Sequence, residues 1–177
     1  MRDGRDEGVD DDAKVLLGEF VAARTPALMR VAYLLTGDRH AAEDLLQAAL
    51  AKTISKWRTI RHADPEGYVR TVMYREQVTW WRRLHRYREI VLRQPAEQAS
   101  PDPAAATDLR LAMRAALRQL PPAQRTVLVL RYYEDLSETQ IAEALHCSLG
   151  TVRSRTHRAV ARLRQVLPTI EDLEVPR

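Results

Sequence analysis

Arginine side chains are concentrated in two stretches of the chain, and both have the chemistry to hold a polyanion. One stretch is residues 82–88, and the other is residues 153–164, which contains no acidic residue. A guanidinium group binds phosphate or guanine through paired hydrogen bonds. The net charge of +4 has the matching sign. The two stretches predict contacts with a long polyanion such as nucleic acid, and solvated helix faces are the simpler alternative.

Residue types that carry out catalysis do not group along the sequence. Glu43 and Asp44 are adjacent, so their side chains diverge on a helix. Cys147 has only His146 beside it, without the spacing of zinc ligands, and is expected to be a small buried residue of a turn. The sequence has no glycine-rich phosphate loop. We therefore expect no catalytic residue, metal site or cofactor, which argues against a nuclease or recombinase.

A helix-turn-helix is expected over residues 137–163. Ser137 suits the N-cap of a short first helix, and Gln140 stands where it completes a capping box. Ser148 suits the N-cap of a second helix, expected over residues 149–166. The buried stripe of this second helix is predicted from Val152, Ala159 and Leu163. The opposite face then offers DNA the side chains of Arg153, Ser154, His157 and Arg158.

The first half of the chain is expected to form a helical bundle. Glycine is scarce, with only 6 residues, and apolar residues recur at three-and-four spacing. Pro26 suits the first turn of a helix, and Gly37 suits the C-cap at which that helix ends. The next helix is expected to continue through Trp57, and another follows the break at Pro65.

The fold class expected is all-α, with two small helical domains joined by a proline-rich linker. The N-terminal bundle spans residues 13–93, the linker residues 94–107, and the C-terminal helix-turn-helix bundle residues 108–167. Residues 1–12 are acidic and expected to be a disordered tail, and residues 168–177 form a C-terminal tail. No apolar run approaches the roughly 20 residues of a membrane span, and no secretory signal is found. We therefore expect a cytoplasmic protein.

The C-terminal half resembles region 4 of extracytoplasmic-function (ECF) sigma factors of the sigma-70 family. The resemblance lies in residues 136–145 (LSETQIAEAL) and 148–155 (SLGTVRSR), with the entry LPPAQR at residues 120–125. In that family this domain reads the promoter −35 element. The resemblance implies −35 contacts by Arg153, Ser154, His157, Arg158, Arg155 and Thr151.

The N-terminal half resembles region 2 of the same family, in residues 37–47 (GDRHAAEDLLQ). The resemblance implies that Asp44 and Gln47, with Glu43 beside them, face the clamp helices of the polymerase β′ subunit. Asp44 and Gln47 are three residues apart and therefore neighbours on one helix face. Without the resemblance, a solvated face of a bundle helix would be the preferred interpretation.

The stretch after residue 79 resembles the part of region 2 that captures a flipped base of the −10 element and melts the duplex. Aromatic rings beside arginines suit single-stranded DNA, whose bases stack on rings while guanidinium groups hold phosphates. Many family members carry asparagine at the position that aligns with Arg75, which leaves the details of −10 preference open. The residues implied are Trp80, Trp81, Arg82, Arg83, Arg86 and Arg75. One of the two tryptophans is expected in the core.

The resemblance extends over most of the chain and is closest to the actinobacterial SigE-like subgroup. It implies a transcription initiation factor whose partners are core RNA polymerase, through the β′ clamp helices and the β flap, and promoter DNA. It leaves open whether an anti-sigma protein holds the two domains together. The alternative is a stand-alone helix-turn-helix regulator, which binds its operator without polymerase and usually as a dimer.

Overall fold

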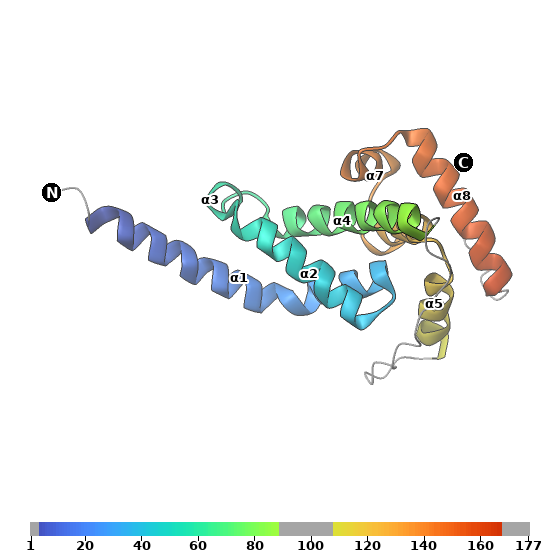
Figure 1. Cartoon of the computed structure of the whole chain (residues 1–177), viewed down its shortest axis with the longest axis horizontal. Coiled ribbons are helices and arrows are strands. Elements are labelled where there is room, and N and C mark those ends of the chain that lie inside the picture. The colour runs from blue at the N-terminus through green and yellow to red at the C-terminus, as the bar shows by residue number, and fades with distance from the viewer. Residues whose placement is uncertain (1–3, 89–107, 168–177) are drawn as a thin grey trace.

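The computed structural model describes the backbone of residues 4–88 and 108–167, and the side chains of residues 13–79 and 111–167. Within these parts every regular element is a helix (Figure 1), which confirms the all-α prediction. The linker expected at residues 94–107 and the tail expected at residues 168–177 lie outside the described residues.

Helix α1 (Gly4–Thr36) is a single element of 33 residues that contains Pro26, so the prediction that Pro26 begins a new helix is wrong. Proline cannot donate to the carbonyl of Ala22, and both residues are exposed to solvent. The helix also includes residues 4–12, which corrects the expectation of a disordered tail there. Acidic residues near a helix N-terminus interact favourably with the helix dipole.

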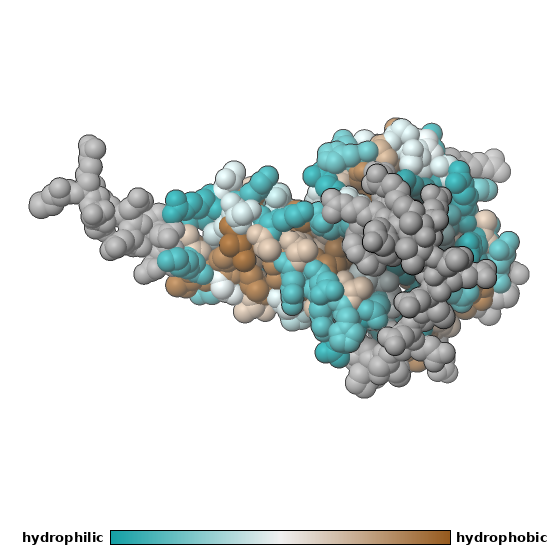
Figure 2. Space-filling view, in the orientation of Figure 1, coloured by the Kyte–Doolittle hydropathy of each residue, from teal (hydrophilic) through white to brown (hydrophobic). Residues whose placement is uncertain are grey.

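The N-terminal part of α1 projects from the body of the molecule (Figure 1). Beside the grey tip, Figure 2 shows apolar side chains among polar ones on the surface, and Val15 and Leu16 of α1 are 59% and 47% exposed. Closer to the body, Phe20 packs against Trp57, with ring centroids 5.3 Å apart. The projecting part of α1 thus leaves more of its apolar surface in solvent than the part that follows.

Three further helices complete the N-terminal half. Gly37 ends α1 as expected, with a φ of 76° that suits glycine, and Asp38 caps α2 (Arg39–Ile54) by accepting from the Ala41 N–H at 2.8 Å. The short α3 (Trp57–Ile60) is a separate element, so α2 ends before Trp57 rather than running through it as predicted. Helix α4 (Pro65–Arg88) begins at a proline, where the missing N–H has no intrahelical partner to lose.

The C-terminal half consists of α5 (Asp108–Arg118), α6 (Pro122–Leu128), η1 (Val129–Tyr133), α7 (Glu138–Leu145) and α8 (Leu149–Val166). The element η1 is a π-helical turn that continues directly from α6, a feature the sequence pattern does not predict. Helices α7 and α8 form the predicted helix-turn-helix. Its N-caps are Ser137, with the capping box completed by Gln140, and Ser148.

Two clusters of buried apolar side chains hold these helices together. The larger cluster contains residues of α1, α2 and α4 together with residues of α6, η1, α7 and α8. The smaller cluster joins α5, α6 and α8. Helix α4 packs against α2 and also against α6 and α7. The two halves therefore lie directly against each other, and α4 is the main element between them.

Candidate functional site

Helix α8 presents the predicted arginine-rich face to solvent. The stripe of Val152, Ala159 and Leu163 is buried as predicted, so the opposite side of the helix faces outward. On that side Arg153, His157 and Arg158 are exposed. Arg153 also donates from Nε to Glu138 Oε2 of α7 at 2.8 Å, which ties the start of α8 to the first helix of the motif.

The other three residues predicted on this face are only partly exposed. The hydroxyl groups of Thr151 and Ser148 lie 2.9 Å apart, and Ser154 Oγ donates to the Thr151 carbonyl at 3.1 Å. Arg155 is half-buried, and its Nη1 atom is buried without a hydrogen-bond partner among the described residues. The face available to a ligand is therefore centred on Arg153, His157 and Arg158.

Helix α2 presents a different outward face. Its buried side carries Ala42, Leu45, Leu46, Ala49 and Thr53, which leaves Asp44 and Gln47 exposed. Glu43 is half-buried and accepts a hydrogen bond from Arg39 Nε at 3.0 Å. The structure therefore places Asp44 and Gln47 together on the outward face of α2, while the Glu43 carboxylate is already engaged by Arg39.

Helix α4 carries the residues predicted to contact the second DNA element. Arg75 is exposed, and its Nε donates to the Ala144 carbonyl near the end of α7 at 2.9 Å. The backbone of residues 80–88 continues α4. The side chains of Trp80, Trp81, Arg82, Arg83 and Arg86 lie outside the described residues, as does the prediction that one tryptophan is core.

A polar cluster joins α4 to the C-terminal half. The guanidinium group of Arg70 binds the carboxylate of Glu134, the residue that follows η1, and its Nη2 lies 2.8 Å from Glu66 Oε1. Tyr74 donates from its hydroxyl to Glu134 Oε2 at 2.7 Å. The Glu134 side chain is only 9% exposed, so this carboxylate depends on its two partners for compensation.

Both partners of Glu134 have shifted pKa values. Burial alone lowers the pKa of Arg70, but hydrogen bonds to Glu66 and Glu134 outweigh it, and the pKa is raised above its ordinary value. Burial raises the pKa of the Tyr74 hydroxyl, and the Glu134 carboxylate raises it further. Arg70 therefore stays charged and Tyr74 stays a hydrogen-bond donor at neutral pH.

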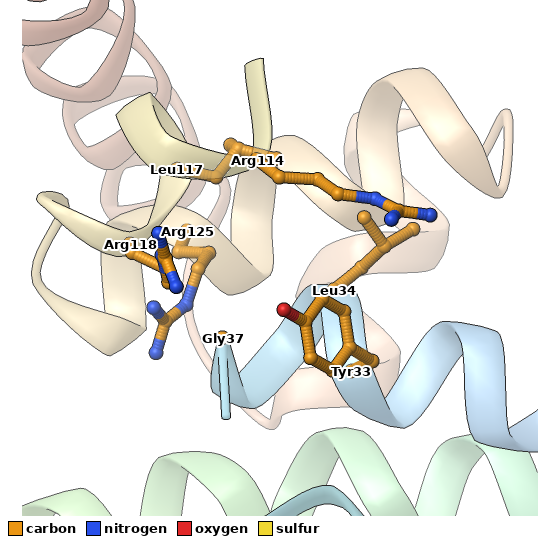
Figure 3. A pocket seen from close by; sticks show the side chains of 7 residues that line it. All are labelled: Tyr33, Leu34, Gly37, Arg114, Leu117, Arg118 and Arg125. Atoms are coloured by element: carbon orange, nitrogen blue, oxygen red, sulfur yellow. The ribbon is translucent and has the colours of Figure 1, made fainter. Parts of the chain in front are cut away.

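A second junction surrounds the end of α1 (Figure 3). The guanidinium groups of Arg118 and Arg125 lie near each other beside Gly37. The buried Arg125 donates from Nε to the Leu35 carbonyl at 2.8 Å, and Gln77 Nε2 donates to the same carbonyl at 3.0 Å. These two donors satisfy a carbonyl near the helix C-terminus that has no intrahelical partner.

Arg125 is a buried cation bonded to a carbonyl. Burial, together with the nearby charge of Arg118, lowers the pKa of Arg125 to about 10, so the guanidinium remains charged at neutral pH. The negative end of the α1 dipole favours a cation at this position.

The sequence reasoning missed the residues of both junctions: Arg70, Tyr74, Glu134 and Arg125. Arg125 had a detectable signal, because it lies two residues before the apolar run that begins at Val127. Glu134 had none, because it lies between two predicted helices and resembles an ordinary loop residue. Cys147 is half-buried against the larger core cluster, in line with its predicted place in the turn.

No group of three or more metal-binding side chains comes together among the described residues. The same part of the chain contains no helix long and apolar enough to span a membrane.

Comparisons with known proteins match both halves. The family model described as Sigma-70 region 2 matches residues 20–87, and the one described as Sigma-70, region 4 matches residues 110–163. The RNA polymerase sigma-E factor of Streptomyces coelicolor is 41% identical over 152 residues, which cover 84% of each chain. The ECF RNA polymerase sigma factor SigL of Mycobacterium tuberculosis is 36% identical, covering 85% of this chain and 86% of that relative.

A solved structure with the same fold is the sigma factor RpoE in complex with the anti-sigma factor NepR from Bartonella quintana. The similarity has a TM-score of 0.66 and covers 86% of this chain and 97% of that chain, at 24% sequence identity.

Proposed function

The chain belongs to the sigma-70 family of RNA polymerase sigma factors, and from this premise we propose how its own residues direct polymerase to a promoter. Residues 13–93 act as region 2 and residues 108–167 as region 4, joined by the linker at residues 94–107. Polymerase supplies the catalysis, and the protein works in the cytoplasm beside the chromosome.

The outward face of α2 binds the clamp helices of the polymerase β′ subunit. Asp44 and Gln47 support this role because both are exposed and lie one helical turn apart. The carboxylate accepts hydrogen bonds from a partner's arginines, and the amide both donates and accepts. Glu43 contributes less, because Arg39 already occupies its carboxylate.

The outward face of α8 binds the −35 element. The first residues of the second helix in such a motif enter the major groove, and here Arg153, His157 and Arg158 are exposed. Arginine suits guanine edges or phosphates. Ser154, Thr151 and Arg155 are half-buried and contribute at the rim of this face.

Helix α4 acts on the −10 element. Arg75 lies on this helix, and the residues that follow combine aromatic rings with arginines: Trp80, Trp81, Arg82, Arg83 and Arg86. Rings on which unstacked bases rest, beside cations that hold phosphates, favour binding of a melted strand.

The observation that carries the proposal is that one chain presents two outward faces of different chemistry. The α2 face offers a carboxylate and an amide, whereas the α8 face offers arginine and histidine without a free acid. A stand-alone regulator needs only the second face. A sigma factor needs both, because it binds a protein with one and DNA with the other.

Run-off transcription tests the α2 face. Core RNA polymerase from Streptomyces coelicolor, the source of the 41% identical relative, is mixed with genomic promoter fragments and with either the wild type or Asp44→Ala/Gln47→Ala. We expect discrete transcripts from the wild type. The double variant should lose at least about tenfold in core affinity, equivalent to about 1.4 kcal/mol, and lose transcripts in proportion.

The matched control is Glu19→Ala/Gln119→Ala, which removes an exposed acid and an exposed amide elsewhere on the molecule and should behave as wild type. The proposal fails if the wild type never associates with core polymerase yet binds promoter fragments by itself. The α2 assignment alone fails if both double variants bind core polymerase equally well.

A further inference from the structure

Three arginines lie around the end of α1 at the second junction. Arg118 and Arg125 lie beside Gly37, and the Cζ atom of Arg114 lies 5.7 Å from the centre of the Tyr33 ring (Figure 3). Among the described residues, no carboxylate forms an ion pair with any of the three. We propose that Arg118 and Arg125 form a binding site for a compact phosphate oxyanion, either inorganic phosphate or the terminal phosphoryl group of a small nucleotide.

The positive charge at this junction lacks a counter-charge. Arg125 is only 5% exposed, and its Nε donates to a neutral group, the Leu35 carbonyl, at 2.8 Å. The end of the α1 dipole carries roughly half a negative charge, which offsets a minor part of two guanidinium charges. A buried charge is costly without a partner of opposite sign, and burial together with the charge of Arg118 lowers the pKa of Arg125. An anion bound by both guanidinium groups removes their mutual repulsion.

Gly37 allows the two arginines to meet at one point. A Cβ added to Gly37 would lie 2.6 Å from Arg118 Cγ and 2.8 Å from Arg125 Nη1, so both side chains use the space that a larger residue would fill. Within the described part of the chain, the Nη atoms of Arg125 have no hydrogen-bond acceptor. The hydroxyl of Tyr33, which lines the same pocket, points toward the arginine pair (Figure 3). The pocket therefore offers several donors that converge on one place.

Converging donors of this kind suit a compact phosphate group. A planar guanidinium group binds two phosphate oxygens at once, and a hydroxyl donates to another. Leu34 and Leu117 also line the pocket, and such apolar walls leave recognition to the charged groups. The outward face of α8 differs, because its arginines are exposed along a helix and suit an extended nucleic acid. At the junction Arg125 is buried, which favours a small ligand over a duplex.

Phosphorus NMR on the full-length chain tests the site. Inorganic phosphate is titrated at constant pH, and its linewidth reports binding. Sodium chloride keeps the ionic strength constant, because salt screens the charges of the site. We expect saturable broadening with the wild type. Arg118→Gln removes one of the two cations and should weaken phosphate binding at least about tenfold, because charge-assisted hydrogen bonds are the strong ones.

Arg162→Gln is the matched control, because Arg162 is an exposed arginine of α8 that does not line the pocket. Its phosphate affinity should stay within about twofold of wild type, since a distant exposed charge is screened by salt. The proposal is overturned if the wild type shows no saturable binding, or if both variants weaken binding equally. If Arg118→Gln loses native circular dichroism, Tyr33→Phe decides: a loss of about threefold, as expected for one hydrogen bond, supports the site, and an unchanged affinity overturns it.

A second titration, with ADP, identifies the source of the phosphate group. ADP that binds at least as tightly as inorganic phosphate, and more weakly to Arg118→Gln, assigns the site to the terminal phosphoryl group of a nucleotide. Weaker binding of ADP assigns the site to the free ion. If phosphate does not bind the wild type while Arg118→Gln lowers the affinity for duplex DNA, the proposal is overturned and the arginine pair belongs to the DNA surface. The phosphate titrations use no polymerase, so their failure leaves the proposed function unchanged.

Discussion

The two halves of the molecule differ in how far each builds a core of its own. In the N-terminal half, α1, α2 and α4 bury Leu28, Leu46 and Val69 against one another. In the C-terminal half the buried residues divide: Ile141 and Val152 of the helix-turn-helix belong to the cluster centred on the N-terminal half, whereas Leu163 belongs to a separate cluster with α5.

This difference teaches that a motif with its own sequence signature need not be a separate packing unit. The capping box and the turn of the helix-turn-helix are local features, set by hydrogen bonds within a few residues. Its apolar side continues into the core of the other half. Boundaries of motifs and boundaries of cores therefore fall in different places in this chain.

The largest expected effect comes from Ile141→Ala, in the core that spans the halves. Ile141 is fully buried, and truncation of such a side chain destabilises a protein by about 2–5 kcal/mol. All three tryptophans (Trp57, Trp80 and Trp81) lie in the N-terminal half. Although Ile141 lies in the C-terminal half, we therefore expect Ile141→Ala to lower the denaturant midpoint that tryptophan fluorescence reports for the N-terminal half.

Leu163→Ala is the comparison variant, because Leu163 is also buried but packs only in the smaller cluster. It should lower the stability of the C-terminal half and move the tryptophan midpoint less than Ile141→Ala. Equally small shifts of the tryptophan midpoint in both variants would show that the halves unfold independently. That result would contradict a core shared between them.

A smaller effect is expected from Gly37→Ala, at the junction between the halves. Gly37 has a φ of 76°, and an added Cβ would lie 2.6 Å from Arg118 Cγ and 2.8 Å from Arg125 Nη1. The left-handed conformation alone costs about 1–2 kcal/mol for a residue with a side chain. We expect thermal unfolding to show a loss of at least this size.

Gly18→Ala sharpens this test, because Gly18 lies inside α1 with nothing within 4 Å of an added Cβ. That variant should stabilise the chain by roughly 0.5–1 kcal/mol. A Gly37→Ala protein as stable as wild type would mean that the two arginines do not hold the end of α1 as described.

The smallest effect is expected from Ser137→Ala, within the C-terminal half alone. Ser137 Oγ accepts from the Gln140 N–H at 3.2 Å, and the Ser137 N–H donates to Gln140 Oε1 at 2.8 Å. Loss of an N-cap costs about 1 kcal/mol. Hydrogen exchange should become faster in α7 and stay unchanged in α2; acceleration in both would mean that the cap supports the whole molecule.

Local signals in the sequence predicted much of this fold. Gly37 and the caps Ser137 and Ser148 mark boundaries that the structure places as predicted, because each depends on backbone geometry within one turn. Pro26 misled the prediction, because α1 continues through it although an interior proline removes one hydrogen bond and crowds the preceding turn. Whether the rest of a helix outweighs that cost depends on its packing, which periodicity does not reveal.

The candidate site also contains features that the sequence predicts and others that it does not. The exposure of Asp44 and Gln47, and of Arg153, His157 and Arg158, follows from which face of each helix is apolar, so the sequence was sufficient. The Arg70–Glu134 pair joins residues 64 positions apart. A pairing between residues so far apart in the sequence depends on how the halves pack. Neither residue belongs to a sequence pattern that predicts it.

The π-helical turn has a consequence for how this chain tolerates changes in length. Each residue of a helix advances the direction of the next side chain by about 100°, and η1 holds one residue more than an α-helical turn would need. Deleting a single residue from Val129–Tyr133 would restore the α-helical repeat and turn Glu134 away from α4. The helix-turn-helix that follows would keep all its own residues, but the contact of Glu134 with Arg70 and Tyr74 would be lost.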